Sequence, residues 1–442
     1  MKQLNKVIEY GLYLLIFLLP WQTRLFLKIS RLKGGYFEYG SLSLYLSDIV
    51  LVLILILALI ARTQEIKNRS RTLGTKIEIT IQKISWIFVL FLNLGALVSI
   101  LVAPDRSVAG YRYLILCLGM GLYWLLASAR FDKAKAFFSL AAALGIQAAL
   151  GIWQFLKQAS FASKWLGLAV HRPGELGASV VETYRGERWL RAYGGLDHPN
   201  VLGGSLAVGL LVLIFLLVRR LKEKGGGWEK ASLFLFYFLS LVALFFTFSR
   251  GAWLGLAAGG LIILAGLFLK GDEEGEKIFL KILIASSLVV ALLFFRYHEL
   301  VLTRFNHDTR LEVRSNQERL ESYQVAARLI SGHRFGGVGI GNYTIALSKL
   351  KPALEAWAYQ PTHNVFLLVW AETGLLGLVG FAGLFLYSFW AARRQVFSLA
   401  ILAALLAMFS VDHWWWSLHY GMLFLWLVLG MVLALTEEEN TF

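Results

Sequence analysis

Residues 199–218 read PNVLGGSLAVGLLVLIFLLV, and two arginines, Arg219 and Arg220, follow directly. A helix needs about 20 consecutive apolar residues to cross the hydrocarbon core of a bilayer, which is about 30 Å thick. Proline suits the first position of a helix, and arginines suit the boundary between lipid and water. This stretch therefore predicts a membrane-spanning helix that begins at Pro199.

The rest of the chain repeats this pattern. Of its 442 residues, 58% are hydrophobic and 16% are charged, whereas soluble domains carry roughly 25% charged residues. We therefore expect an all-α polytopic membrane protein with about twelve spans. The predicted spans cover about 7–27, 43–61, 84–103, 110–129, 136–156, 199–218, 231–248, 251–269, 277–296, 364–390, 396–411 and 418–436.

The basic residues indicate which ends of the spans face the cytoplasm, because short cytoplasmic loops are enriched in Lys and Arg. With the N-terminus inside, the inner loops hold clusters of Lys and Arg, whereas the short outer turns at 104–109 and 412–419 hold only Arg106. The many arginines of the two long outer loops do not contradict this topology, because long loops are translocated largely regardless of their charge. The first span ends in Pro20-Trp21 without a small-residue cleavage site, so we expect an uncleaved anchor. An even number of spans returns the tail to the cytoplasm.

The net charge of +15 is explained by this insertion signal and by attraction to anionic membrane lipids. No basic segment outside the membrane alternates with aromatic residues, so we expect no nucleic-acid partner. The single cysteine, Cys117, lies within a span and is expected to serve packing.

Two long outer loops divide the chain into regions. The loop at 297–363 contains a one-sided apolar pattern over Ser315–Leu329, which predicts a helix along the outer membrane surface. A glycine-rich turn follows at 336–342, and it is a weak nucleotide signal because no βαβ unit surrounds it. The predicted regions are 1–198 with about five spans and the first long loop, 199–296 with the central spans, 297–363, 364–436 with the last spans, and the acidic tail 437–442.

The histidines lie on one side of the predicted membrane. All eight fall in outer loops or at outer ends of spans, which places any proton transfer on the outer face. An alternative is that inner loops simply favour Lys and Arg for insertion. The histidines are His171, His198, His298, His307, His333, His363, His413 and His419.

Two outer segments carry arginines suited to binding an anion. In Arg188–Asn200, the N-terminus of the helix that begins at Pro199 would point its free N–H groups outward, close to Arg191. Arg250 lies in a tight turn between two apolar helices, and a guanidinium can grip phosphate oxygens with paired hydrogen bonds. Alternatively, Arg191 caps a helix or pairs with Asp197, and Arg250 anchors its turn to lipid head groups.

A third segment, Gln360–Asn364, places His363 where water meets hydrocarbon. A histidine there can exchange protons at neutral pH while it contacts a lipid-borne substrate. The alternative is that His363 caps the following helix. Glu372 lies within that helix, where burying a charged side chain in the membrane is energetically unfavourable. We favour a structural role for Glu372 over direct catalysis.

These segments together resemble the bacterial O-antigen ligase/polymerase family. The resemblance covers roughly 185–390 and separates neither ligases from polymerases nor either from protein-glycosylating relatives. The residues that carry it are Arg191, Gly194, Pro199-Asn200, Phe248-Ser249-Arg250-Gly251, Gly337-Val338-Gly339, His363-Asn364, Leu367, Glu372 and Gly374.

The resemblance implies a GT-C-like glycosyltransferase of the bacterial cytoplasmic membrane. Such an enzyme moves a glycan from an undecaprenyl-pyrophosphate donor to a glycan, lipid or protein acceptor on the outer face, without a metal or other cofactor. Arg191 and Arg250 would bind the pyrophosphate, and His363 would take the proton of the acceptor hydroxyl. Glu372, Asn364 and Asn200 would support the site.

Further candidates rank below these residues. Arg185, Arg188 and Arg334 are additional candidates for phosphate contact. His413 and Trp415, in the aromatic turn at 412–416, are candidates for acceptor binding, although an interfacial aromatic belt explains that turn equally well. We find no His/Asp pattern with metal-ligand spacing. The alternative of another class is a transporter or flippase of lipid-linked sugars, but we find no internal repeat of the kind such transporters show.

Overall fold

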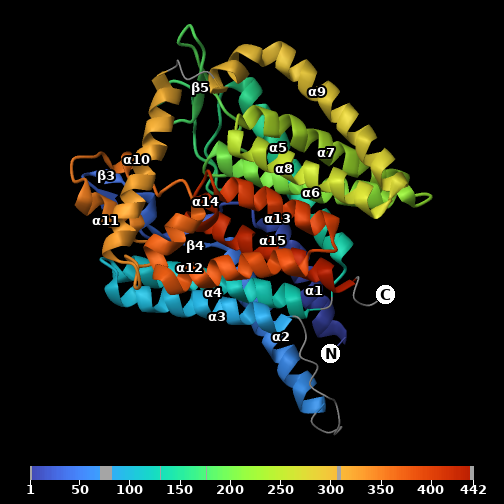
Figure 1. Cartoon of the computed structure of the whole chain (residues 1–442), viewed down its shortest axis with the longest axis horizontal. Coiled ribbons are helices and arrows are strands. Elements are labelled where there is room, and N and C mark those ends of the chain that lie inside the picture. The colour runs from blue at the N-terminus through green and yellow to red at the C-terminus, as the bar shows by residue number, and fades with distance from the viewer. Residues whose placement is uncertain (1, 70–81, 130, 176, 306–309, 439–442) are drawn as a thin grey trace.

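The computed structural model describes residues 2–69, 82–129, 131–175, 177–305 and 310–438. Over these residues the chain is a bundle of long helices with three small two-stranded sheets (Figure 1). Ten of the helices are long and apolar enough to cross a membrane. The predicted all-α polytopic membrane fold is therefore confirmed. Parts of the sequence argument lie outside the described residues, namely the inner loop at 70–81, His307 and the end of the acidic tail.

The ten helices correspond closely to predicted spans. They are α2 (Leu46–Arg69), α3 (Gln82–Val102), α4 (Arg106–Ser128), α5 (Lys133–Lys157), α6 (Pro199–Lys222), α7 (Gly227–Thr247), α8 (Arg250–Lys270), α9 (Glu273–Phe305), α12 (Val365–Ala391) and α15 (His419–Glu438). Two other predicted spans correspond to shorter apolar helices, α1 (Lys2–Leu18) with 17 residues and α13 (Val396–Phe409) with 14.

The end of the first predicted span, 7–27, is wrong. Helix α1 stops at Leu18, and the chain then forms strand β1, which pairs antiparallel with β4. The physical reason is Arg24, whose guanidinium binds the Glu38 carboxylate at 2.6 Å instead of entering lipid. The elements here are β1 (Arg24–Lys28), β2 (Arg31–Leu32), β3 (Gly35–Tyr36), the 3₁₀ helix η1 (Glu38–Gly40) and β4 (Leu42–Tyr45).

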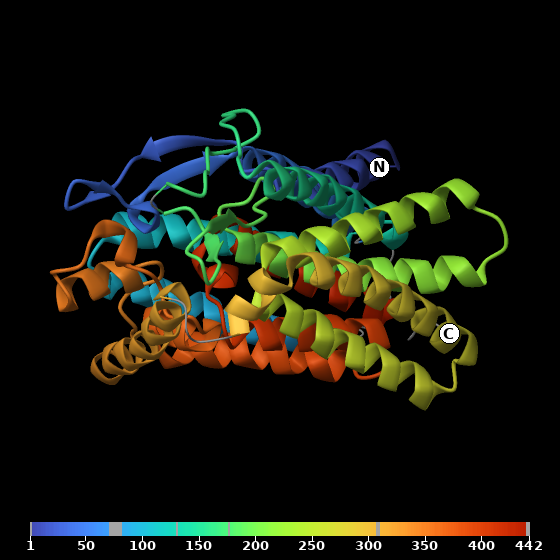
Figure 2. The same cartoon turned by 90° about the horizontal axis from the view of Figure 1, so that it is seen from above.

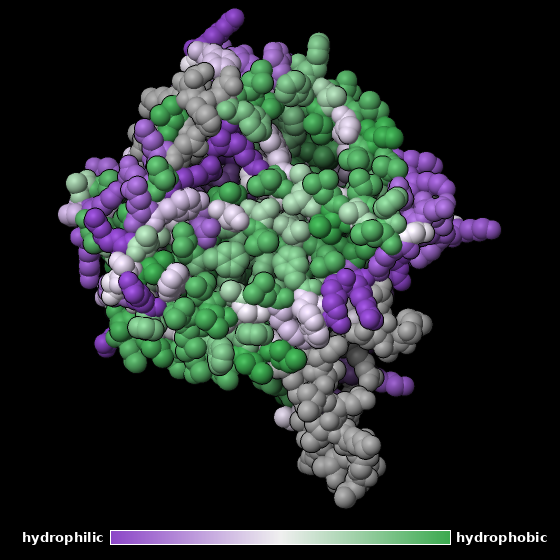
Figure 3. All heavy atoms as spheres, in the orientation of Figure 1, coloured by the Kyte–Doolittle hydropathy of each residue, from purple (hydrophilic) through white to green (hydrophobic). Residues whose placement is uncertain are grey.

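The long helices run side by side, and both termini lie at one end of the bundle (Figures 1 and 2). The strands lie at the opposite end, together with α10 (Arg310–Gly332) and α11 (Tyr343–Leu350), and we call this the loop end. Helices α6 and α15 are buried along almost their whole length, so they form the centre of the bundle. Figure 3 shows a broad apolar surface between two polar ends, as expected for a protein that spans a bilayer.

The second long loop is mostly helical. Helix α9 continues to Phe305 through a break at Tyr297, where the predicted outer loop begins. Helix α10 contains the predicted helix at Ser315–Leu329, and it runs across the loop end roughly perpendicular to the bundle (Figure 1). Short helix α11 and the 3₁₀ helix η2 (Ala356–Ala358) complete the loop before α12 begins. The position of α10 along the outer membrane surface stays a prediction.

Helix α12 is broken at Gly374, and the glycine-rich turn fills the break. The N–H groups of Val338 and Gly339 donate to the carbonyls of Ala371 and Glu372, at 2.8 and 3.0 Å. Residue 374 has φ 69° and ψ −175°, a conformation open essentially to glycine alone. The turn at 336–342 therefore completes the hydrogen bonding of a discontinuous membrane helix, which explains its glycines without a nucleotide.

Candidate functional site

His363 lies directly before the first turn of α12, at the loop end of the bundle. The helix cap is its neighbour Asn364, whose Oδ1 accepts the N–H of Leu367 at 3.0 Å. The alternative that His363 caps this helix is therefore wrong. Its Nδ1 is buried and has no hydrogen-bond partner among the described residues. This ring nitrogen takes no part in a structural hydrogen bond among these residues, so it can bind or exchange a proton.

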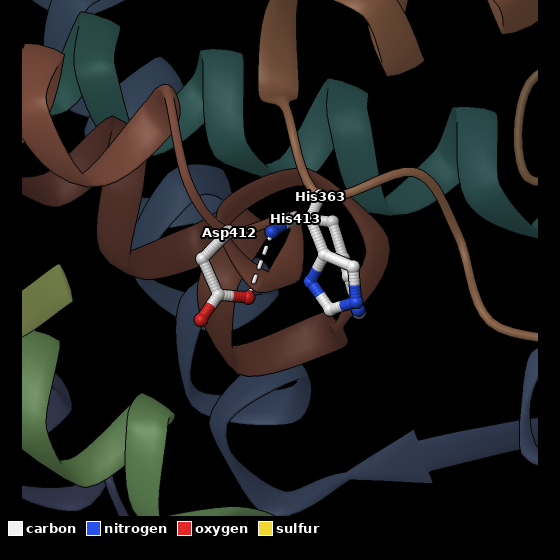
Figure 4. Close-up of side chains that lie close together, drawn as sticks. All are labelled: His363, Asp412 and His413. Atoms are coloured by element: carbon white, nitrogen blue, oxygen red, sulfur yellow. Dashed lines mark hydrogen bonds between the residues drawn. The ribbon is translucent and has the colours of Figure 1, made fainter. Parts of the chain in front are cut away.

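Two further residues, Asp412 and His413, lie beside His363. They occupy the turn between α13 and α14 (Trp414–Ser417), and the two imidazole ring centres are 5.0 Å apart. Asp412 Oδ1 accepts the backbone N–H of His413 at 2.8 Å, and Figure 4 shows both rings beside this carboxylate. One potential ligand atom from each of the three residues lies within 4.8 Å of the others.

This cluster corrects the expectation that no His/Asp group has metal-ligand spacing. His363 lies in one turn at the loop end and Asp412-His413 in another, so their separation in sequence hides their proximity. Asp412 belongs to the aromatic turn at 412–416, and sequence reasoning missed it as a site residue. A signal was available, because an acidic residue directly before a histidine in an outer turn is chemically unusual in so apolar a region.

The surroundings of the cluster favour neutral imidazoles. Burial lowers the pKa of His413 to about 3, assisted by the nearby His363 ring. Burial also lowers the pKa of His363, although the Asp412 carboxylate opposes this shift. Burial alone would raise the pKa of Asp412, but the neighbouring histidines and the N–H of His413 outweigh it and lower that pKa. At neutral pH the site thus contains two neutral rings beside an ionised carboxylate.

Arg191 is tied into the structure by three hydrogen bonds of its guanidinium. It is 4% exposed and donates to the carbonyl of Thr247 at 2.6 Å, to Ser179 Oγ at 2.8 Å and to Asn200 Oδ1 at 2.7 Å. Asn200 in turn donates from Nδ2 to Asp412 at 2.9 Å. One hydrogen-bonded path therefore joins Arg191 to Asp412 of the histidine cluster.

The start of α6 matches the prediction. His198 is its N-cap, and its Nδ1 accepts the N–H of Asn200 at 3.1 Å, with Pro199 in the first turn. Burial, together with the positive charge of Arg191, lowers the pKa of His198 to about 3. This histidine is therefore neutral at pH 7 and already used as a cap.

Arg250 stands at the first position of α8, and its Nη1 donates to the carbonyl of Arg304 at 2.9 Å. Arg304, at the end of α9, donates from Nε to the carbonyl of Phe248 at 3.2 Å. Phe248 adopts a left-handed conformation with φ 47°, which is uncommon for a bulky residue and typical of functional turns. Because Arg191 binds the adjacent carbonyl of Thr247, three arginines meet at this turn, and sequence reasoning missed Arg304.

The lower-ranked arginines are placed differently. Arg188 lies in strand β6 (Arg188–Leu190), which pairs with β5 (Val180–Glu182), and Arg185 is exposed at the tip of that hairpin. Arg334 is exposed, and its carbonyl accepts the N–H of Leu375 at 2.9 Å. Leu375 lies about 15 Å along α12 from the first turn of that helix. The backbone of Arg334, which is bonded to Leu375, is therefore not beside His363.

Glu372 uses its carboxylate in contacts with other elements, and the structural role favoured for it stays a prediction. Its carboxylate accepts the N–H groups of Gly341 and Tyr343 at 2.8 and 3.3 Å and the indole N–H of Trp416 at 2.9 Å. These contacts attach the glycine-rich turn, α11 and α14 to the broken helix. Hydrogen bonds to an ionised carboxylate are strong, so Glu372 joins these elements firmly.

The proposed role of Trp415 in acceptor binding is contradicted. Its side chain is fully buried and stacks on Trp414 at 4.0 Å between ring centres. Trp414 and Trp416 are also buried, so the aromatic turn is neither a sugar-stacking surface nor an interfacial belt. The short α14 turns these rings into the bundle, where they contact α12 and α15. His413, the other acceptor candidate, belongs to the cluster around His363.

Two other arginines were missed. Arg319 of α10 carries a buried Nε without a hydrogen-bond partner among the described residues, and its charge acts on His363. Arg112 of α4 is 7% exposed and lines two neighbouring cavities at the loop end. It forms neither a hydrogen bond nor an ion pair with any other described residue. Its position inside a predicted span was a signal, because a charge there is costly.

Comparison with known proteins identifies a family for part of the chain. Residues 235–382 match the family model of the O-antigen ligases, a region that contains Arg250, Arg304, His363 and Glu372. No curated protein matches the chain significantly. The resemblance to the O-antigen ligase family is confirmed, and it supports an enzyme of the ligase/polymerase type that transfers glycans. Arg191, Asp412 and His413 lie outside the matched region.

Proposed function

We propose that this chain, with its O-antigen ligase domain, transfers a glycan from an undecaprenyl-pyrophosphate donor to an acceptor hydroxyl, with His363 as general base and without a metal. The loop end would face away from the cytoplasm, on the outer side of the bacterial inner membrane. The observation that carries the proposal is the half-buried His363 imidazole, whose buried Nδ1 has no partner among the described residues, beside Asp412. A neutral imidazole in this setting can accept a proton as the acceptor attacks.

Asp412 would assist this step electrostatically. When His363 takes the acceptor proton it becomes positively charged, and the nearby carboxylate stabilises that charge. Asn200 keeps the carboxylate oriented by donating to its Oδ2 at 2.9 Å. In the Ser-His-Asp triads of hydrolases, an ionised carboxylate likewise stabilises the protonated histidine ring.

The arginines at the turn around Phe248 would hold the leaving group. As the acceptor oxygen bonds to the anomeric carbon, the bond from that carbon to the phosphate oxygen breaks, and undecaprenyl pyrophosphate leaves with the electron pair. Arg191 and Arg250 now donate to protein oxygens, so phosphate oxygens would compete for the same N–H groups. Fixed guanidinium groups can offset the developing negative charge without Mg²⁺. A single displacement of this kind inverts the anomeric configuration.

The same site would serve a ligase, a polymerase or a protein-glycosylating relative, which differ in acceptor. A transporter of lipid-linked sugars is less well supported, because the polar groups gather at one end of the bundle. Transport sites typically lie near the middle of the bilayer between repeats. The described residues instead combine a base candidate with several anion-binding groups at one edge.

Purified protein in lipid nanodiscs tests the proposal directly. It should transfer sugar from a lipid-pyrophosphate-linked glycan to lipopolysaccharide core or another hydroxyl acceptor, and the rate should be unchanged by EDTA. Product is measured by gel shift and by mass spectrometry of the released undecaprenyl pyrophosphate. Loss of transfer with EDTA, restored by a divalent ion, would exclude the metal-free mechanism.

Arg191→Lys should weaken donor use by about tenfold or more, because a point charge replaces a guanidinium that makes several directed hydrogen bonds. The measurement is KM for the lipid-linked donor, with acceptor held saturating. Arg188→Lys is the matched control, because Arg188 lies in strand β6 of the same segment and makes no side-chain hydrogen bond to the described residues of the turn around Phe248. This substitution should leave KM unchanged. Equal effects of both substitutions would remove Arg191 from the donor site.

A further inference from the structure

We propose that His363, Asp412 and His413 form a binding site for a first-row divalent ion, zinc above all, and that the bound ion inhibits transfer. The inhibition rests on the proposed function, whereas the binding does not. The ligand set is two imidazoles and one carboxylate, whose potential ligand atoms lie within 4.8 Å of one another. Two histidines with one carboxylate is a recurrent ligand set for zinc and related ions.

His413 is held in the form that binds metal. Ser417 Oγ donates to the carbonyl of His413 at 3.2 Å and lies 2.7 Å from the ring Nδ1. Because the hydroxyl has only one hydrogen, Nδ1–H donates to this oxygen, and the lone pair of the neutral ring is on Nε2. Such a hydrogen bond to the second ring nitrogen fixes the tautomer of metal-binding histidines.

His363 contributes the second, independent observation. Its Nδ1 is buried and has no hydrogen-bond partner among the described residues. A buried polar atom without a partner is destabilising, and a metal ion bound to it would supply that partner. Ligand atoms bound to one zinc ion lie roughly 3–4 Å apart, so modest rotations of the two rings close the remaining gap.

Asp412 is supported in the manner of a metal-binding carboxylate. Its Oδ1 accepts the N–H of His413 at 2.8 Å, and its Oδ2 accepts from Asn200 Nδ2 at 2.9 Å. Each carboxylate oxygen has a further lone pair for an ion. On α10, the positive charge of Arg319 and the negative charge of Glu318 act on His363 in opposite directions. The chemistry favours zinc over Mg²⁺ or Ca²⁺, which prefer oxygen ligands.

Inhibition follows from competition for one atom. An ion bound to His363 occupies the ring nitrogen that the proposed reaction needs as proton acceptor. It also neutralises Asp412, which would otherwise stabilise the protonated ring. With three protein ligands, the fourth position of zinc remains open, so the ion would sit where the acceptor hydroxyl must approach.

The site is tested on the full-length, EDTA-treated protein in nanodiscs, without donor or acceptor. Wild type should bind about one Co²⁺ per chain, with the visible absorption of a tetrahedral site, and Zn²⁺ should displace it. His363→Gln and Asp412→Asn should each weaken binding by about 100-fold or more, since even outer-shell changes cost 10–100-fold. His298→Gln, which alters an exposed histidine of α9, should bind like wild type. Thermal unfolding checks that each variant is folded, and zinc should raise the midpoint of wild type.

The transfer assay then separates the two claims. Micromolar Zn²⁺ should inhibit wild type, and EDTA should restore the full rate. Wild type that binds no stoichiometric Co²⁺ or Zn²⁺, or folded His363→Gln and Asp412→Asn variants that bind normally, would overturn the site. Binding without any transfer activity in the absence of zinc would leave the site standing and refute the proposed function instead.

Discussion

His363→Ala should reduce glycan transfer by about 10²–10⁴-fold, the usual contribution of a positioned general base. The ring contacts the cluster but caps no helix, since Asn364 performs that task. The variant should therefore insert, fold and bind donor normally. Transfer is measured in single turnovers, with donor affinity determined separately. His298→Ala provides the control, because that histidine is exposed on α9.

The pH profile distinguishes a base from a structural histidine. Because burial lowers the pKa of His363 from 6.5, the wild-type rate should be constant through pH 7 and fall only at lower pH, as the ring becomes protonated. The residual activity of His363→Ala should lack this acidic limb. Full activity in the variant, or an unchanged profile, would show that another group accepts the proton.

Gly374→Ala should prevent correct assembly of the loop end. A Cβ at this position would lie 1.9 Å from the carbonyl oxygen of Phe335, and the backbone conformation is open essentially to glycine alone. Backbone strain alone costs about 1–3 kcal/mol, and the glycine-rich turn would also be forced out of the break in α12. We expect little monodisperse protein after solubilisation, a lowered unfolding midpoint and no transfer.

Gly260→Ala is the matched control for that substitution. Gly260 lies within α8, and a Cβ there meets no atom within 4 Å. Alanine is favoured over glycine in a helix by about 0.8–1 kcal/mol, so this variant should be as stable as wild type or more so. A folded, active Gly374→Ala protein would show that the break in α12 is not required for the site.

Much of the fold could be predicted because spans are local features. Residues 199–218 form α6 since an apolar run of that length satisfies its own backbone hydrogen bonds in lipid, whatever surrounds it. Arg191, Arg250 and His363 were identifiable for a related reason, because polar groups at the ends of apolar helices are few and conspicuous. The prediction for the first span is wrong at its end, because it extended the apolar run past Arg24 into residues that form strand β1.

The membrane class, most of the helices and part of the site, namely Arg191, Arg250 and His363, could be read from the sequence. Tertiary structure alone decided which of them meet, because contacts between distant turns depend on how the helices pack. The packing of the helices places Asp412 and His413 beside His363, buries Trp415 and inserts the glycine-rich turn into the break of α12. Local hydrophobicity does not predict such contacts, because they are made by side chains from separate helices and turns.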